Sequence, residues 1–209
     1  MGSIHRTHPY GEGRWDGVGW RRRSLFGALG LRPPLSDATA PEIELLREQV
    51  ASAQRIVEIG VFEGAASAEL GGLLRPDGEL VLIDPYPPGT VFGLNMAQLT
   101  ARRAVRRSVE ANVRWLREIS TEAVAEWSDP IDFLRIDGLH TLEGVQRDWI
   151  DWSPFVVPGG RAVVRCDVVT ETAEEHVQGD EIVPWILARE SDWELAARVE
   201  TTAVLRRAG

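Results

Sequence analysis

The sequence has little cysteine, no long apolar run and no excess of positive charge, and each absence excludes a class of protein. Its single cysteine, Cys166, cannot form an internal disulfide, so nothing points to a secreted, disulfide-stapled chain. No apolar run approaches the roughly 20 residues that span a bilayer. The N-terminus also lacks the apolar stretch of a signal peptide. We therefore expect a cytoplasmic protein without membrane contact.

The balance of charge disfavours nucleic acid as a partner. The net charge is −9, from 32 acidic and 23 basic residues, whereas phosphate binding needs a concentrated basic face. Basic residues do cluster at 21–23 and at 102–107. The second group recurs at helical spacing and is most simply a solvated helix face.

Residues 1–34 differ in composition from the rest of the chain. They are rich in glycine, show no sustained periodicity and end in Pro33-Pro34. We interpret them as an N-terminal arm or lid, because they are too short and too glycine-rich to hold a core of their own. Their apolar side chains are costly to leave in water, so we expect the arm to pack on residues 35–209 or on a second copy of the chain. Residues 35–209 then form one domain, and the arm predicts a homodimer as one arrangement.

From about residue 40 the apolar pattern alternates between helical and strand periods, which indicates βαβ units around a parallel sheet. The predicted helices are 40–52, 64–74, 95–112, 142–155 and 181–191. The predicted strands are 55–60, 79–84, 113–119, 131–137 and 161–167, the last of them entered by a tight turn at 158–160. Two final runs, 193–199 and 203–207, are close enough to form an antiparallel hairpin. A purely parallel dinucleotide-binding fold would not end in this way.

The strongest motif is a glycine turn that follows the first predicted strand. Gly60 lets the backbone turn sharply and approach a ligand, and Gly64 lets the next helix present its N-terminal N–H groups. Dinucleotide folds need a further glycine where this chain has Phe62, which disfavours a nicotinamide-dependent oxidoreductase. The carboxylate of Glu58, two residues before the first glycine, suits a cationic or amine-bearing ligand better than a pyrophosphate. An ordinary strand-to-helix turn is the alternative.

The second predicted strand ends in one acid, Asp84. It lies 24 residues after Gly60 (84 − 60), near the offset of about 20 residues expected for an acid that binds ribose hydroxyls. Taken alone, Asp84 is equally well explained as a turn or capping residue. Together with Glu58 and the two glycines, it indicates a nucleoside site.

Polar residues also end the fourth and fifth predicted strands. Asp137 ends the fourth, and His140 follows in the loop at the carboxyl edge, where α/β sheets bind ligands. An imidazole can act as general base near neutral pH, and capping of the next helix is the alternative for His140. Asp167 emerges at the same edge as Asp137. Two such carboxylates can hold a hard divalent cation or cap their own loops, and the sequence leaves both open.

In combination, these motifs resemble the class I S-adenosylmethionine-dependent methyltransferases. The motifs that carry the resemblance are Glu58-Ile59-Gly60 with Gly64, Asp84, Ile136-Asp137-Gly138-Leu139-His140 and Pro158-Gly159-Gly160. The branch that the chain resembles is related to O-methyltransferases that tailor antibiotics and sugars. The resemblance covers about residues 40–207. It implies an α/β, Rossmann-like doubly wound fold with a seven-stranded, mainly parallel sheet and an antiparallel last strand.

The resemblance also implies S-adenosyl-L-methionine as cofactor, a small-molecule acceptor, and a role for each motif residue. Glu58, Gly60 and Gly64 would line the amino-acid end of the cofactor, Asp84 would hold the ribose, and Ser120 would lie near adenine. Asp137 and His140 would face the methyl group, with His140 as the catalytic base.

Two departures from the family pattern concern a metal. Leu139 stands where the family has a second acid, and Cys166 replaces a polar residue before Asp167. Metal-dependent relatives draw ligands from these stretches, so we expect activity without a metal, and Asp137 and Asp167 are the ligands if one is bound.

The favoured function is therefore O-methylation of a small hydroxylated molecule, such as a natural product or a sugar. N-methylation of a small amine is the main alternative, because an amine needs no strong base. A nicotinamide-dependent oxidoreductase and a non-catalytic protein on the same fold are the others.

Overall fold

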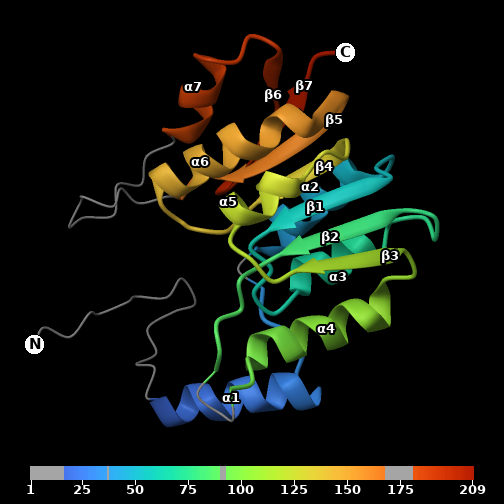
Figure 1. Ribbon diagram of the computed structural model, residues 1–209, viewed down its shortest axis with the longest axis vertical. Coiled ribbons are helices and arrows are strands. Elements are labelled where there is room, and N and C mark those ends of the chain that lie inside the picture. The colour runs from blue at the N-terminus through green and yellow to red at the C-terminus, as the bar shows by residue number, and fades with distance from the viewer. Residues whose placement is uncertain (1–16, 37, 90–92, 168–180) are drawn as a thin grey trace, which may run out of the picture.

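The computed structural model describes residues 17–36, 38–89, 93–167 and 181–209, with the side chains of the first helix from Arg23 onward. Within these residues the chain forms a seven-stranded sheet of order β3-β2-β1-β4-β5-β7-β6 (Figure 1). The strands are β1 (Arg55–Ile59), β2 (Glu79–Ile83), β3 (Asn112–Leu116), β4 (Ile131–Ile136), β5 (Val156–Arg165), β6 (Trp193–Val199) and β7 (Thr202–Arg207). Strands β1 to β5 are parallel, and β7 is antiparallel to both β5 and β6. The predicted sheet with its terminal hairpin is confirmed.

Helices cover both faces of this sheet (Figure 1). They are α1 (Gly17–Leu29), α2 (Ala40–Val50), α3 (Ala65–Gly71), α4 (Met96–Ser108), α5 (Ser120–Ala123), α6 (Leu142–Trp152) and α7 (Ile182–Leu187), with short 3₁₀ turns at Val124–Glu126 and Ser153–Phe155. The apolar side chains of α2, α3 and α4 pack with one face of the sheet, and those of α5, α6 and α7 pack with the other. None of the helices in the described ranges is both long and apolar enough to cross a membrane.

The central strands are apolar on both sides because both sides are covered. In β2, Leu80 and Leu82 belong to the core beneath α2–α4, while Val81 and Ile83 belong to the core beneath α5–α7. Successive strand residues point to opposite faces, so a strand buried on both faces becomes one continuous apolar run. This explains why the short apolar runs in the sequence predicted the inner strands.

Helix α1 is the main element that the sequence did not predict. Residues 17–29 form a helix that packs against α4, within the segment predicted as an N-terminal arm or lid. Gly27 is buried, and a Cβ on it would lie 2.9 Å from Thr100 Oγ1 of α4. Glycine at this position therefore permits close packing of two helices. High glycine content is typical of loops, but at Gly27 the small residue serves the packing of α1 on α4.

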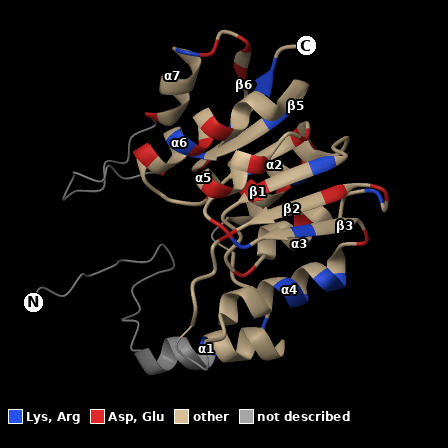
Figure 2. Ribbon diagram, in the orientation of Figure 1, with Lys and Arg blue, Asp and Glu red and all other residues tan. Residues whose placement is uncertain are grey.

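The structure also bears on two smaller predictions, the tight turn at 158–160 and the basic helix face at 102–107. Residues 158–160 lie inside β5, at an irregularity in its pairing with β4, and do not form a turn that precedes the strand. Basic residues do recur along α4 (Figure 2), and among them Arg102, Arg106 and Arg107 are exposed. The predicted solvated face is therefore present for these three arginines, whereas Arg103 of the same group is only partly exposed and lies against Gly30.

Candidate active site

The glycine turn after β1 packs directly on the end of β4. Gly60 has a φ of +85°, and a Cβ on it would lie 2.1 Å from the Asp137 carbonyl oxygen and 2.6 Å from Gly138 Cα. The backbone N–H of Asp137 donates to the Ile59 carbonyl at 2.8 Å. Gly60 is thus required by the sheet itself, in addition to any ligand. The turn predicted to bind a cofactor and the predicted catalytic carboxylate are neighbours.

The second glycine, Gly64, has a φ of +73° and precedes the first residue of α3. A Cβ on it would lie 2.9 Å from Ala101 Cα. Gly64 therefore allows α3 to begin close to α4, and its predicted place beside the cofactor stays a prediction.

Asp84 fixes the shape of the same glycine turn. Its Oδ2 accepts hydrogen bonds from the backbone N–H groups of Val61 at 3.1 Å and Phe62 at 3.0 Å. Its Oδ1 accepts from the N–H of Tyr86 at 3.0 Å, and the Tyr86 hydroxyl donates back to the Phe62 carbonyl at 2.9 Å. Phe62 has a φ of +53°, an unfavourable conformation that these contacts stabilise. Asp84 is only half-buried, so it is accessible to a ligand while it holds the turn.

A row of alternating charges, buried except for its last member, crosses the carboxyl edge of β1, β4 and β5. It consists of Glu58, Arg135, Asp137, Arg165 and Asp167. Glu58 Oε1 accepts from Arg135 Nη1 at 2.6 Å, and Glu58 Oε2 accepts from the Ser67 hydroxyl at 2.5 Å. Arg135 Nη2 then donates to Asp137 Oδ2. The row follows from the parallel register, which places Glu58 beside Arg135.

The other end of this row comes from β5. Arg165 donates to both carboxylate oxygens of Asp167, from Nε at 2.9 Å and from Nη2 at 2.8 Å. Its Nε also lies 3.5 Å from Asp137 Oδ1. The two carboxylates predicted as metal ligands are therefore bridged by a guanidinium of the chain itself.

His140 lies against the same carboxylate. Its Nε2 is 3.4 Å from Asp137 Oδ1, and its side chain is 42% exposed, whereas the side chain of Asp137 is 3% exposed. At 3.4 Å this is a long contact for a hydrogen bond. The N-cap of α6 is Thr141, whose hydroxyl accepts from the Gly144 N–H at 3.0 Å. Thr141 therefore caps α6 in place of His140, and His140 contacts the predicted catalytic acid, Asp137.

Two acids of this row, Glu58 and Asp137, have opposite pKa shifts. Burial raises the pKa of Glu58 to about 7, because it outweighs the opposing effects of Arg135 and Ser67. Burial also acts to raise the pKa of Asp137, but Arg135, His140 and Arg165 together bring it below its usual value. Arg135 is shared by both carboxylates, and Asp137 additionally has the Arg165 guanidinium and the His140 imidazole beside it. Asp137 is therefore the carboxylate that stays ionised.

Ser120, predicted to lie near adenine, is bonded to an acid that the sequence analysis did not select. Its hydroxyl donates to Asp148 Oδ1 at 2.5 Å, across the contact of α5 and α6. Burial raises the pKa of Asp148 to about 6, against the lowering effect of Ser120. A Cβ on Gly138 would lie 3.5 Å from Asp148 Oδ2, so this pair borders the end of β4. The sequence signal that could have identified Asp148 is an acidic residue within the apolar face of α6.

Two arginines of this edge were also missed. Arg135 and Arg165 interrupt strands that are otherwise apolar, and both are buried. An arginine within a buried strand requires an acidic partner, which was the available signal. A further missed pair joins Arg32 to buried Glu63, the residue before Gly64, by two hydrogen bonds of 2.6 Å. It ties the segment after α1 to the glycine turn.

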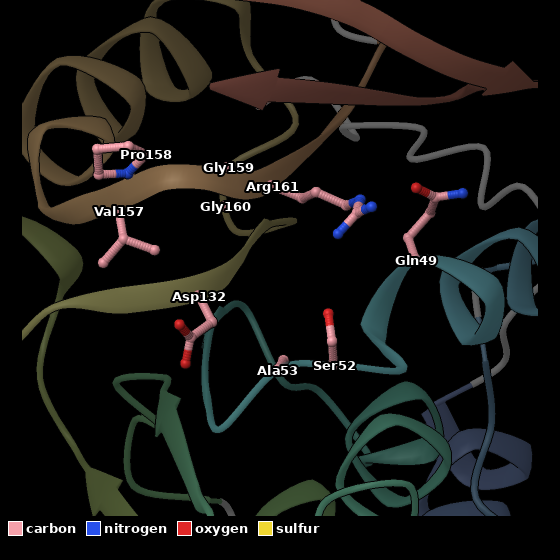
Figure 3. Close-up of a pocket in the computed structure, with 9 residues that line it drawn as sticks. All are labelled: Gln49, Ser52, Ala53, Asp132, Val157, Pro158, Gly159, Gly160 and Arg161. Carbon is pink, nitrogen blue, oxygen red and sulfur yellow. The ribbon is translucent and has the colours of Figure 1, made fainter. Parts of the chain in front are cut away.

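A cavity of about 200 Å³ lies at the opposite, amino edge of the sheet (Figure 3). Its lining residues are Gln49, Ser52, Ala53, Asp132, Val157, Pro158, Gly159, Gly160 and Arg161. Asp132 Oδ2 accepts there from the backbone N–H groups of Gln54 at 3.0 Å and Arg55 at 2.8 Å. None of the predicted site residues lines this cavity. The candidate active site is therefore the carboxyl edge.

Comparison with known proteins gives the chain a family. A sequence model described as "Methyltransferase domain" matches residues 57–164, more than half of the chain. No curated protein matches. Among solved structures, the chain is similar to the O-methyltransferase from Bacillus cereus in complex with SAH, with 18% identity, 90% of each chain covered and a TM-score of 0.61.

Two further solved structures extend the comparison. One is the O-methyltransferase TomG from Streptomyces achromogenes, involved in tomaymycin synthesis and in complex with SAM, with 22% identity, 94% of this chain and 98% of that chain covered, and a TM-score of 0.59. The other is the N-methyltransferase NodS from Bradyrhizobium japonicum WM9 in complex with SAH, with 17% identity, 83% and 90% covered, and a TM-score of 0.57. These structures share the fold, and the family match covers the strands that form the carboxyl edge, β1 to β5. The chain therefore belongs to the methyltransferase-domain family and is an enzyme of that class.

Proposed function

We propose that the protein transfers a methyl group from S-adenosyl-L-methionine to a hydroxyl group of a small molecule. The observation that carries the proposal is the contact of the Gly60 turn with Asp137 and Gly138, because it joins the proposed cofactor turn to the proposed catalytic pair. The family match and the similarity to structures that hold SAM or SAH support this reading.

The residues at the carboxyl edge fit the chemistry of this cofactor, which is a cation at its sulfonium centre. The row holds three carboxylates and two guanidinium groups, and Asp137 Oδ1 has only long contacts, of 3.4 Å to the His140 imidazole and 3.5 Å to the Arg165 guanidinium. This oxygen is suited to a cationic group at short range. Asp84 and Ser120 would hold the adenosyl part, and the bound cofactor would supply the electrophilic methyl group. Glu58, whose buried carboxylate accepts a hydrogen bond from Arg135, would act as a positioning residue that holds this guanidinium in place.

In the proposed mechanism, His140 removes the proton of the acceptor hydroxyl. Asp137 lies on the Nε2 side of the imidazole, so Nδ1 is the nitrogen that would take the proton. A carboxylate behind the ring orients it and stabilises the imidazolium as it forms. The partly exposed side chain is accessible to an acceptor, while the rigid strand ends hold the reacting groups in alignment.

The finer assignments belong to the same proposal. The acceptor is a small hydroxylated molecule such as a natural product, as the involvement of the similar TomG in tomaymycin synthesis suggests. Residues 1–34 act as an arm of the active site or of a dimer, and part of this segment is joined to the glycine turn through Arg32 and Glu63. Action in the cytoplasm and assembly as a homodimer stay predictions.

The test combines cofactor binding with the loss of His140. Calorimetry should show saturable binding of S-adenosylhomocysteine and no binding of NAD. With S-adenosylmethionine and a panel of small alcohols, phenols and amines, release of S-adenosylhomocysteine reports turnover. His140→Ala should lower the rate about 10²–10⁴-fold, the usual contribution of a general base, with cofactor affinity nearly unchanged. Leu139→Ala, an exposed neighbour in the same loop, is the matched control and should retain activity.

The opposite results are equally informative. Binding of NAD without binding of S-adenosylhomocysteine would refute the cofactor assignment. Normal turnover by His140→Ala would remove this residue from the mechanism. An amine acceptor, which needs no strong base, would then be the better proposal.

A further inference from the structure

The carboxylates that end β4 and β5 share one cation, and that cation is covalently part of the chain. Arg165 binds both oxygens of Asp167 at 2.9 and 2.8 Å and lies 3.5 Å from Asp137 Oδ1. The side chains of Arg165 and Asp137 are 7% and 3% exposed. A fork with two parallel N–H···O contacts is the strongest geometry that a guanidinium makes with a carboxylate.

The strand register brings these three residues together. Ile136 of β4 pairs with Val164 of β5, so the next residues along the parallel strands, Asp137 and Arg165, are neighbours. Asp167 follows two positions later, on the same side as Arg165. The guanidinium is thereby held between the two strand ends, where two uncompensated carboxylates would repel each other.

We infer that Arg165 takes the place of a divalent cation between Asp137 and Asp167, and that it is a positioning residue for the active site. A hard cation such as Mg²⁺ needs near-octahedral oxygen ligands. Both oxygens of Asp167 are bonded to Arg165, and the neighbouring residues Leu139 and Cys166 offer no oxygen from their side chains. Among the described residues, no group of three or more His, Cys, Asp or Glu side chains is arranged to hold a metal.

This arrangement has a functional consequence for Asp137. A guanidinium stays charged at every accessible pH and cannot be removed by a chelator. Together with Arg135 it favours the ionised form of Asp137, and it contacts the carboxylate oxygen that faces His140. The inference rests on the proposed methyl transfer only for its activity readout, and the metal-binding readout below is independent of it.

The experiment titrates Mn²⁺ into the full-length protein by calorimetry and compares four chains. They are the wild type, Arg165→Ala, Arg165→Lys and, as matched control on the same strand at the amino edge, Arg161→Ala. We expect no saturable Mn²⁺ binding by the wild type, the Lys variant or the control. Arg165→Ala removes the guanidinium between the two carboxylates, which leaves Asp167 without its bonded cation and Asp137 with Arg135 alone, and it should gain Mn²⁺ binding. Turnover should survive EDTA in the wild type, fall at least tenfold in Arg165→Ala and recover in part in Arg165→Lys.

Saturable Mn²⁺ binding by the wild type, or loss of its activity in EDTA with rescue by Mg²⁺, would overturn the inference. Wild-type activity in Arg165→Ala without a gain of metal binding would also overturn it. If Arg165→Ala does not fold, the wild-type titration and the partial activity of Arg165→Lys still decide the question. A failure to bind S-adenosylhomocysteine would count against the proposed function alone, since the Mn²⁺ titration would remain valid.

Discussion

Replacement of Asp148 by asparagine should stabilise the protein at neutral pH and have little effect in acid. Asp148 is buried on α6 and is bonded to the Ser120 hydroxyl at 2.5 Å. Burial raises its pKa from 3.8 to about 6. The folded protein therefore binds this proton more tightly than the unfolded chain, and stability is lost as the pH rises from about 4 to about 6.

The size of the effect follows from the same two values. A tenfold change in proton affinity corresponds to about 1.4 kcal/mol, so a rise from 3.8 to about 6 gives a cost of about 3 kcal/mol for ionised Asp148. Asparagine keeps the shape and an acceptor for the Ser120 hydroxyl but carries no charge. Asp148→Asn should then exceed the wild type in stability by about 2–3 kcal/mol above pH 7.

Urea unfolding of the cofactor-free protein at pH 4.5 and pH 8 measures this difference. Glu194→Gln is the control, because Glu194 is an acid on β6 whose pair with Arg206 at 2.5 Å is exposed. Its effect should stay below about 1 kcal/mol. A stability difference between Asp148→Asn and the wild type that does not grow with pH, or that has the opposite sign, would refute the reasoning.

Two further predictions concern the glycine turn. Asp84→Ala removes the acceptor of three backbone N–H groups and should weaken S-adenosylhomocysteine binding by about 1–3 kcal/mol. The control is Asp77→Ala, at an exposed acid. An unchanged dissociation constant in Asp84→Ala would mean that the ribose is held elsewhere. Arg32→Ala leaves buried Glu63 without its cation and should cost about 3–5 kcal/mol in urea unfolding. Arg32→Lys should restore only part of this, because an ammonium cannot form the two-pronged contact, and a loss below 1 kcal/mol would contradict the role given to this pair.

The sheet was predictable because its strands carry their own signal. Leu80 to Ile83 read as one apolar run since helices cover both faces, and the turn residues around them mark where each strand ends. Helix α1 was not predictable by the same means. Its glycines resemble those of a loop, and only the contact of Gly27 with α4 reveals that the small residue serves helix packing.

The candidate site was predicted in its carboxylates and its imidazole but not in its arginines. Asp137 and His140 follow one strand within four residues, so their proximity is encoded locally. The partners of Arg135 and Arg165 depend on which strands are neighbours and in which register. That information arises from the packing of the whole sheet and is absent from any single segment.

The unpredicted arginines also explain how so many acids can lie at one buried edge. Three carboxylates without cations would pay a large desolvation cost, whereas the alternating row pairs each guanidinium with the acids on either side. Burial raises the pKa of Glu58 to about 7, so above this pH the row has three negative and two positive charges, which leaves one negative charge uncompensated. That remaining charge lies at the strand ends, beside the Gly60 turn and next to the least well bonded oxygen, Asp137 Oδ1. A ligand that brings one net positive charge, as a sulfonium nucleoside does, completes the balance, whereas a pyrophosphate would increase the imbalance. The electrostatics of the edge thus support the same cofactor as the glycine turn does, for an independent reason.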